Sequence, residues 1–207
     1  MRTVLNVGCG PRQPDKLSPV FRTPEWREIR LDIDPTVEPD VIATLTDMTV
    51  VADASVDAVW SSHNIEHLYA HEVPQALREF RRVLKPEGFL LITLPDLQAV
   101  AKLVADGGVD SVIMRTRING EEGPPITALD VIFGHGWWIE RGRTYMAHRT
   151  GFSTESLGRR LTEAGFGCVA LRQGPALDLW AIASQRALTA DLGLLDRAIG
   201  KPWEGST

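Results

Sequence analysis

Short apolar runs that alternate with amphipathic segments constrain the fold of this chain more than any other sequence feature. Five runs in the first half are predicted to be strands, at residues 3–7, 28–33, 41–44, 56–61 and 88–94. The fifth run (G-F-L-L-I-T-L) is almost continuously apolar, as expected of a parallel strand that is covered on both faces. Two more strands are predicted at residues 168–172 and 179–183.

Helices are predicted between these runs. Apolar residues recur at helical spacing from Val73 to Leu84, and a second helix is expected from Ser153 to about Ala164. Four prolines between residues 10 and 26 leave room for at most one short helical turn. Strands alternating with helices predict a three-layer α/β fold with a mostly parallel sheet, whose ligand lies at the carboxyl ends of the strands.

Composition narrows the class of protein. The length of 207 residues favours a single domain, residues 1–207, with an amphipathic tail at 185–207. The net charge of -5 argues against a protein whose main task is nucleic-acid binding. No apolar run approaches the roughly 20 residues that span a bilayer, so no membrane partner is expected. Two cysteines are too few for a disulfide framework, which favours the cytoplasm.

Glycines and an acid follow the first two predicted strands. Gly8 and Gly10 come directly after the first strand, where a ligand can approach the backbone closely; a tight turn is the simpler alternative. The fingerprint of dinucleotide-binding proteins requires a further glycine where this chain has Gln13, which argues against a nicotinamide cofactor. Asp32 ends the second strand, where a carboxylate can hold both hydroxyls of a ribose, whereas Asp34 is better explained by a solvated turn.

Asp47 and Met48 form the third signal, between the third and fourth strands. The carboxylate suits the exocyclic amine of an adenine, and the thioether suits its ring.

Taken in this order, the motifs resemble the class I S-adenosylmethionine-dependent methyltransferases. The most specific run is R-E-F-R-R-V-L-K-P-E-G-F-L-L-I-T-L-P-D at 78–96, which is similar to the small type 11 group, and the similarity resumes at 148–166. The resemblance implies a Rossmann-like sheet of seven strands, an antiparallel last strand and S-adenosylmethionine as cofactor. The residues it places at the cofactor are Asn6, Gly8, Cys9, Gly10, Asp32, Asp47, Met48, Ser62 and His63.

The segment H-x-x-E-H contains His63, Glu66 and His67. At helical spacing the two histidines share one face, as two zinc ligands would. The alternative is that Glu66 and His67 pair with each other or with the backbone and fix the loop. We favour this alternative and expect no metal.

Residues 99–150 form an insertion after the fifth strand, which is expected to cover the acceptor side. Its aromatic and arginine residues suggest a pocket, or else an interface such as that of a homodimer. His135 and His148 within it are candidate general bases, with His67 behind them. The Asn- or Asp-Pro-Pro-Tyr signature of nucleic-acid amino-methyltransferases is absent after the fourth strand. Its absence favours O- or N-methylation of a small molecule. The alternative is a non-catalytic nucleotide- or partner-binding module, suggested by Asn6 where the family usually has an acid.

Overall fold

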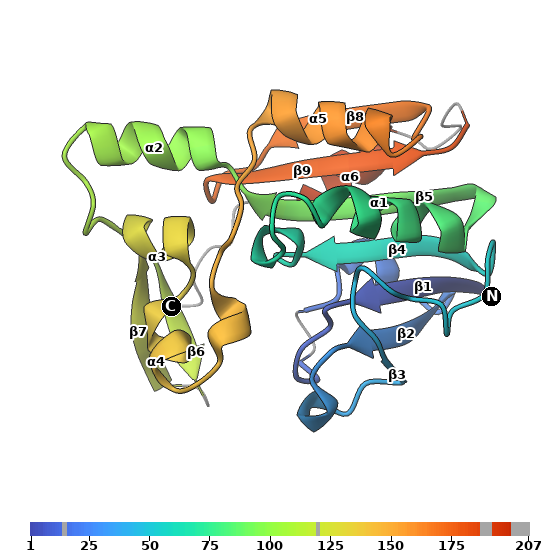
Figure 1. The fold of residues 1–207 in the computed structure, drawn as a ribbon, viewed down its shortest axis with the longest axis horizontal. Coiled ribbons are helices and arrows are strands. Elements are labelled where there is room, and N and C mark those ends of the chain that lie inside the picture. The colour runs from blue at the N-terminus through green and yellow to red at the C-terminus, as the bar shows by residue number, and fades with distance from the viewer. Residues whose placement is uncertain (14–15, 119–120, 187–191, 200–207) are drawn as a thin grey trace.

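The computed structural model describes residues 1–13, 16–118, 121–186 and 192–199, and Figure 1 shows their arrangement. Seven strands form the main sheet. They are β1 (Arg2–Val7), β2 (Trp26–Asp32), β3 (Val41–Ile42), β4 (Val56–Ser62), β5 (Leu84–Pro95), β8 (Cys168–Gln173) and β9 (Asp178–Ser184).

The strand order in this sheet is β3-β2-β1-β4-β5-β9-β8. β1 pairs in parallel with β2 and β4, and β5 continues the parallel arrangement. β9, the last strand in the chain, runs antiparallel to both β5 and β8. The predicted mostly parallel α/β sheet with an antiparallel last strand is therefore confirmed.

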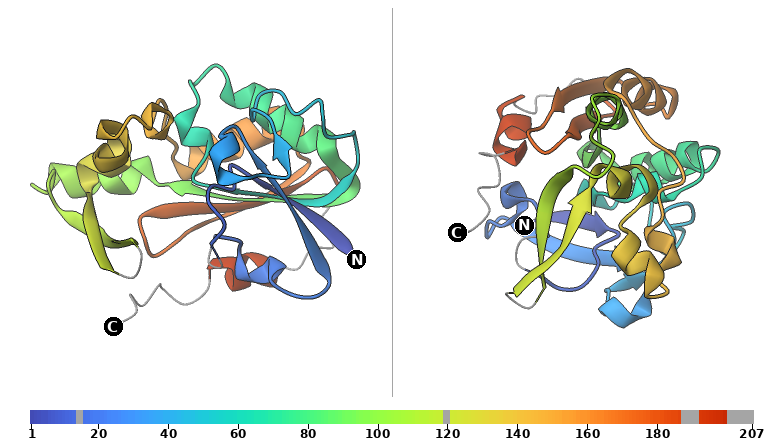
Figure 2. Two further views of the ribbon diagram at one scale, coloured as in Figure 1. Left: turned by 90° about the horizontal axis from the view of Figure 1, so that it is seen from below. Right: turned by 90° about the vertical axis from the view of Figure 1, so that its left-hand side faces the viewer.

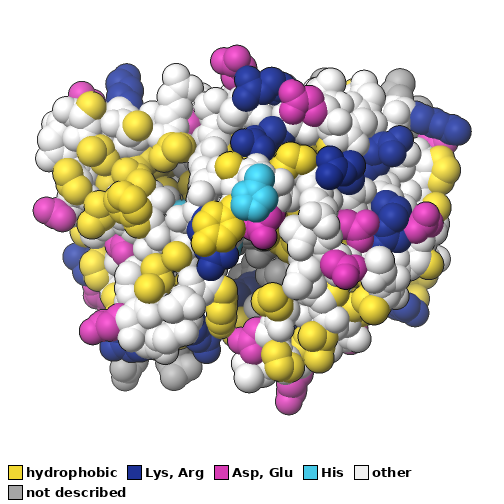
Figure 3. Space-filling view, in the orientation of Figure 1, with side chains coloured by type: hydrophobic (Ala, Val, Ile, Leu, Met, Phe, Trp, Pro, Cys, Tyr) yellow, Lys and Arg dark blue, Asp and Glu magenta, His cyan; other side chains and the backbone are white. Residues whose placement is uncertain are grey.

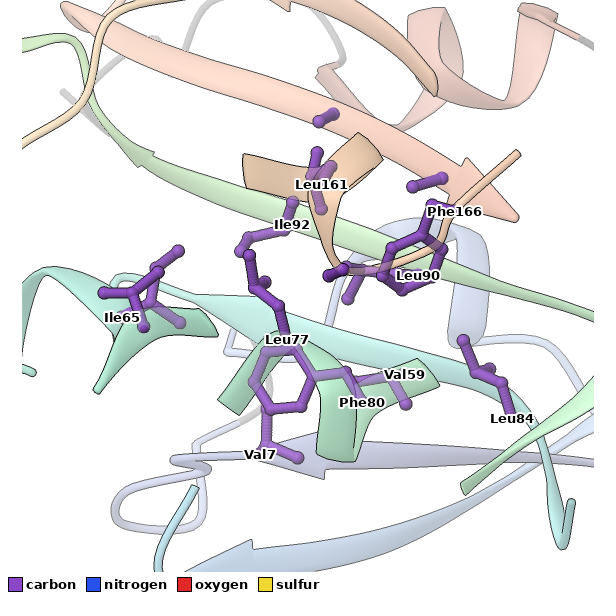
Figure 4. Packing of buried hydrophobic residues seen from close by; sticks show 14 of the residues in the cluster. Val7, Val59, Ile65, Leu77, Phe80, Leu84, Leu90, Ile92, Leu161 and Phe166 are labelled. Carbon is purple, nitrogen blue, oxygen red and sulfur yellow. The ribbon is translucent and has the colours of Figure 1, made fainter. Parts of the chain in front are cut away.

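Helices cover both faces of the sheet, which gives three layers (Figure 2). On one face, α1 (Val73–Val83) and α5 (Thr154–Glu163) pack on the sheet, α5 mainly against β8, and Figure 4 shows Leu77 and Phe80 of α1 in the core on this face. α6 (Leu192–Ile199) and the short 3-10 helix η1 (Pro19–Phe21) cover the other face. The segment between β1 and β2 thus holds one helical turn, as its prolines predict.

Element boundaries differ most from the predictions at β5 and β3. β5 begins at Leu84 rather than at residue 88, and β3 has two residues rather than four. The predicted tail is described only through residue 186 and over α6; its other residues lie outside the described part. None of the helices in the described ranges is long and apolar enough to span a bilayer.

The segment between β5 and α5 forms a small unit beyond the carboxyl ends of the parallel strands (Figure 1). It contains α2 (Leu97–Ala105), β6 (Val112–Ile118), β7 (Glu121–Thr127), α3 (Ala128–Phe133), α4 (Gly136–Glu140) and the 3-10 helix η4 (Thr144–Met146). Among the described strands, β6 and β7 pair only with each other. Two-stranded ribbons have two edges, which is why Pro124 and Pro125 are tolerated in β7. We call residues 97–150 the insertion.

Candidate cofactor and acceptor site

The turn after β1 requires glycine at two positions. Gly8 and Gly10 have φ of 63° and 59°, in the left-handed region that disfavours other residues. A Cβ on Gly8 would lie 1.9 Å from the Asn64 side-chain oxygen, and one on Gly10 would lie 2.4 Å from Lys16 Nζ. Asn64 also donates to the carbonyl of Val7 at 2.7 Å, so the end of β4 holds the turn after β1. Both glycines are therefore needed for this backbone path.

Asp32, the last residue of β2, faces this turn. One carboxylate oxygen accepts from the Gly10 amide at 2.8 Å, and the other accepts from the Asp34 amide at 3.0 Å. The carboxylate is half-buried, so it retains exposed surface for a ligand. Burial lowers the pKa of Lys16, while the nearby Asp32 carboxylate opposes that shift. An anion and a cation thus flank the glycine turn.

Behind the turn, buried polar groups fix the strand ends. Arg30 is buried and donates to the carbonyls of Gly10 at 2.5 Å and Glu38 at 2.7 Å. The Asn6 amide nitrogen donates to Glu28 Oε1 at 2.7 Å, so this asparagine is held by a carboxylate from β2. Burial raises the pKa of the Cys9 thiol to about 11, which keeps the thiol neutral. Asn6, Cys9, Glu28 and Arg30 line a cavity of about 240 Å³, together with residues between 11 and 22.

The predicted adenine contacts lie after β3. Asp47 is exposed, and Oδ1 accepts from the amide and hydroxyl of Thr49, which lowers the pKa of this carboxyl. Met48 differs from the prediction, because its side chain has no exposed surface and packs in the core. Its amide donates to Glu79 and its carbonyl accepts from Arg82, so its backbone is also occupied. In this structure only Asp47 of the pair is open to a ligand.

The loop after β4 connects the glycine turn to the insertion. Ser62 ends β4, and His63 follows with φ of 53°, its amide donating to the Thr93 carbonyl at 2.9 Å. Glu66 lies in the 3-10 helix η3 (Ile65–His67), and its carbonyl accepts from the amide of Arg149 at 2.8 Å. The loop therefore contacts both the main sheet and the insertion.

Two of the three candidate bases meet in this region. The rings of His67 and His148 lie 4.9 Å apart between centroids, beside the buried carboxylate of Glu66. Burial lowers the pKa of His148, against the opposing effect of the Glu66 charge. Burial alone would raise the pKa of Glu66, but the imidazole of His63 outweighs it, and the pKa of this carboxyl is lowered.

His135 is placed elsewhere in the insertion. It precedes α4, its ring stacks on Trp137 at 6.5 Å, and its buried Nε2 has no hydrogen-bond partner among the described residues. The structure therefore groups His67 with His148 and keeps His135 outside that group.

The insertion reaches across to the end of β2 as well. The Tyr145 hydroxyl donates to Asp34 Oδ2 at 3.0 Å, which joins residues 111 positions apart. With the Arg149–Glu66 bond, this attaches the insertion at two points along the strand ends. Figure 3 shows the surface hollowed between the insertion and the main sheet. The bond from Tyr145 to Asp34 and the position of Lys16 over Gly10 could not be predicted from the sequence, because neither depends on a local pattern.

Comparisons with known proteins agree with the fold described above. Residues 5–92 match the family model described as a methyltransferase domain. A comparison with curated proteins gives no match. Solved structures share the fold, among them a "SAM dependent methyltransferase" from Archaeoglobus fulgidus, with a TM-score of 0.57 and 16% identity over 88% of this chain and 85% of that one.

Two further structures are informative. The Burkholderia thailandensis 1,6-didemethyltoxoflavin-N1-methyltransferase, solved with its substrate and S-adenosylhomocysteine, has a TM-score of 0.53 and 14% identity over 88% of this chain and 70% of that one. A complex between the Haloferax volcanii Trm112 methyltransferase activator and a "putative methyltransferase" gives a TM-score of 0.57 and 16% identity over 89% and 82% of the two chains. The matched domain model and these neighbours show that the chain has the fold of the S-adenosylmethionine-dependent methyltransferases.

Proposed function

We propose that the protein transfers the methyl group of S-adenosylmethionine to an oxygen or nitrogen atom of a small molecule. The observation that carries this proposal is the position of the insertion, which is attached to the ends of β2 and β4 beside the glycine turn. Methyl transfer from a sulfonium is an in-line displacement, so the protein needs chiefly to align the acceptor and exclude water. A bounded hollow at the strand ends suits that task.

The cofactor would lie across the ends of β1 and β2. The backbone of the turn at Gly8 and Gly10 would bind its amino-acid part, and Asp32 would accept from the ribose hydroxyls. Lys16, whose ammonium lies over Gly10, is suited to the cofactor's carboxylate. Asp47 would receive the adenine amine. The backbone of Ser62 and His63 would line the methionine part.

Aromatic and cationic side chains of the insertion suggest the kind of acceptor. The guanidinium of Arg141 lies 3.8 Å from the ring centroid of Trp137, and that of Arg143 lies 4.5 Å from the ring centroid of Trp138. Such planar and cationic surfaces suit a flat or anionic small molecule. The Burkholderia thailandensis neighbour, which methylates a small molecule, supports this class of acceptor.

His135 is our first choice of general base, because its Nε2 is buried and unpartnered within the described part. His148 and His67 are the other candidates. A general base increases the rate of proton-transfer-dependent reactions roughly a hundredfold to ten-thousandfold. Release of S-adenosylhomocysteine should be screened against phenols, amines and carboxylic acids. With an acceptor in hand, His135→Ala should lower turnover by that factor, while cofactor affinity stays within about twofold. Normal turnover in this variant would exclude His135 as the base.

A second candidate function is a module that binds a partner protein. The neighbour from Haloferax volcanii, solved with an activator protein, favours considering it. Binding of the cofactor without turnover of any acceptor in the screen would support this candidate.

We also propose, from cysteine usage, that the protein works in the cytoplasm; both Cys9 and Cys168 are free thiols. A homodimer stays a prediction that sedimentation velocity can test.

A further inference from the structure

Three metal-binding side chains from distant parts of the sequence meet beside the site. Glu66 and His67 belong to η3, and His148 belongs to the insertion, 81 positions later than His67. One donor atom of each residue lies within 4.8 Å of the other two. The spacing of the H-x-x-E-H segment does not reveal this group, because its third member arrives only through the fold.

The carboxylate of Glu66 is the unusual member. Its side chain is 2% exposed, and neither oxygen has a hydrogen-bond partner among the described residues. His63 forms an ion pair with it, with Nδ1 at 3.4 Å from Oε1, but that imidazole is 52% exposed and charged only when protonated. A buried carboxylate without a partner costs several kcal/mol unless it is paired or coordinates a metal. Within the described residues, no lysine or arginine forms an ion pair with Glu66, so its only cationic neighbour in an ion pair is a histidine that can lose its charge.

Backbone carbonyls orient both histidines. His148 Nδ1 lies 2.8 Å from the Val131 carbonyl, and His67 Nδ1 lies 3.3 Å from the Ala147 carbonyl. A carbonyl can only accept, so each bond places the proton on Nδ1 and leaves a lone pair on Nε2. Metal-binding histidines are typically oriented in this way by a bond to the other ring nitrogen.

Contrary to the expectation from the sequence, we propose that Glu66, His67 and His148 bind one divalent transition-metal ion, through the Glu66 carboxylate and Nε2 of each histidine. Two imidazoles and one carboxylate suit Zn²⁺ or Fe²⁺, whereas Mg²⁺ prefers oxygen ligands throughout. The three donor atoms already lie within 4.8 Å of one another, and metal–ligand bonds in such a site are about 2.0–2.2 Å long. Three protein ligands leave at least one coordination position open to water or a substrate atom.

The ion would join the loop after β4 to the insertion, and so fix the insertion over the strand ends. A histidine that binds a metal through Nε2 has no lone pair for an acceptor proton. The inference therefore removes His67 and His148 from the candidate bases and leaves His135. It does not depend on cofactor binding, which uses other residues.

The test is a titration of the chelator-treated full-length protein with Zn²⁺ by calorimetry, repeated with Co²⁺ while its visible absorption is recorded. We expect one ion per chain, ligand-field bands of a low-coordinate Co²⁺ site, and no measurable binding of Mg²⁺. Glu66→Gln and His148→Ala each remove one ligand and should weaken Zn²⁺ binding at least about a hundredfold. Replacing a residue that only hydrogen-bonds to a metal ligand already lowers metal affinity roughly 10–100-fold. Circular dichroism and S-adenosylhomocysteine binding confirm that the variants fold.

Two control variants make the result decisive. His71→Ala removes an exposed histidine outside the group and should bind Zn²⁺ as the wild type does. His63→Ala removes the alternative counter-ion and should leave Zn²⁺ affinity within about threefold. The proposal is overturned if the wild type binds no stoichiometric ion, or if Glu66→Gln and His148→Ala bind as tightly as wild type. An equal loss in His71→Ala would show adventitious surface binding and overturn it as well.

Discussion

Replacing Asp32 by alanine removes the one carboxylate that faces the glycine turn from the end of β2. In the free protein it accepts from the amides of Gly10 and Asp34, at 2.8 and 3.0 Å. With cofactor bound, its half-exposed oxygens would also accept from the ribose hydroxyls. A hydrogen bond to a charged group is worth about 1.5–3 kcal/mol, and the partial exposure of Asp32 places the total near the value for a single bond. That corresponds to roughly ten- to hundredfold weaker binding.

The assay is calorimetric titration of wild type, Asp32→Ala and Asp32→Asn with S-adenosylhomocysteine. The asparagine variant keeps one acceptor oxygen and should lie between the other two. Asp57→Ala is the matched control, because Asp57 also accepts from a backbone amide, that of Thr3 at 2.8 Å, but lies at the start of β4, away from the strands' carboxyl ends. It should lower thermal stability without changing affinity. Equal affinities of wild type and Asp32→Ala would refute the role assigned to Asp32.

Three further changes test other parts of the structure. Gly8→Ala forces a Cβ to within 1.9 Å of an asparagine oxygen at positive φ, so both the melting temperature and S-adenosylhomocysteine affinity should fall; an unchanged melting curve would contradict this. Tyr145→Phe loses the bond to Asp34 and should speed S-adenosylhomocysteine dissociation roughly two- to tenfold in stopped flow, whereas an unchanged rate would argue against the insertion as a lid. The bond to Arg82 lowers the pKa of Glu79 below its ordinary 4.5, so Glu79→Gln should lower stability at pH 7, with the difference shrinking as pH falls below 4.5; a pH-independent difference would contradict it.

The main sheet could be predicted from sequence because its signals are local. Apolar runs such as residues 88–94 are buried on both faces, and the spacing of Leu77 and Phe80 sets the buried face of α1. The extension of β5 to Leu84 was missed because Pro86 and Gly88 normally end a strand as well as a helix. The hairpin of β6 and β7 was also missed, because prolines at 124 and 125 argue against a strand unless it lies at an edge.

The candidate site was predictable only where its residues follow strands. Gly8, Gly10 and Asp32 lie at the ends of β1 and β2, and the fold brings them together as the order of motifs predicts. The burial of Met48 could not be predicted, because a methionine beside an exposed acid gives no sign of which of the two is buried. The approach of His148 to His67 depends on the path of the whole insertion, which no local pattern encodes.

A crystal structure with S-adenosylhomocysteine tests the central claim most directly. The account predicts the nucleoside across the carboxyl ends of β1 and β2, with both ribose hydroxyls within hydrogen-bonding distance of Asp32 and the amino-acid part against the turn at Gly8 and Gly10. The sulfur atom should face the hollow below the insertion. A ligand bound elsewhere, or a ribose with no contact to Asp32, would contradict the account.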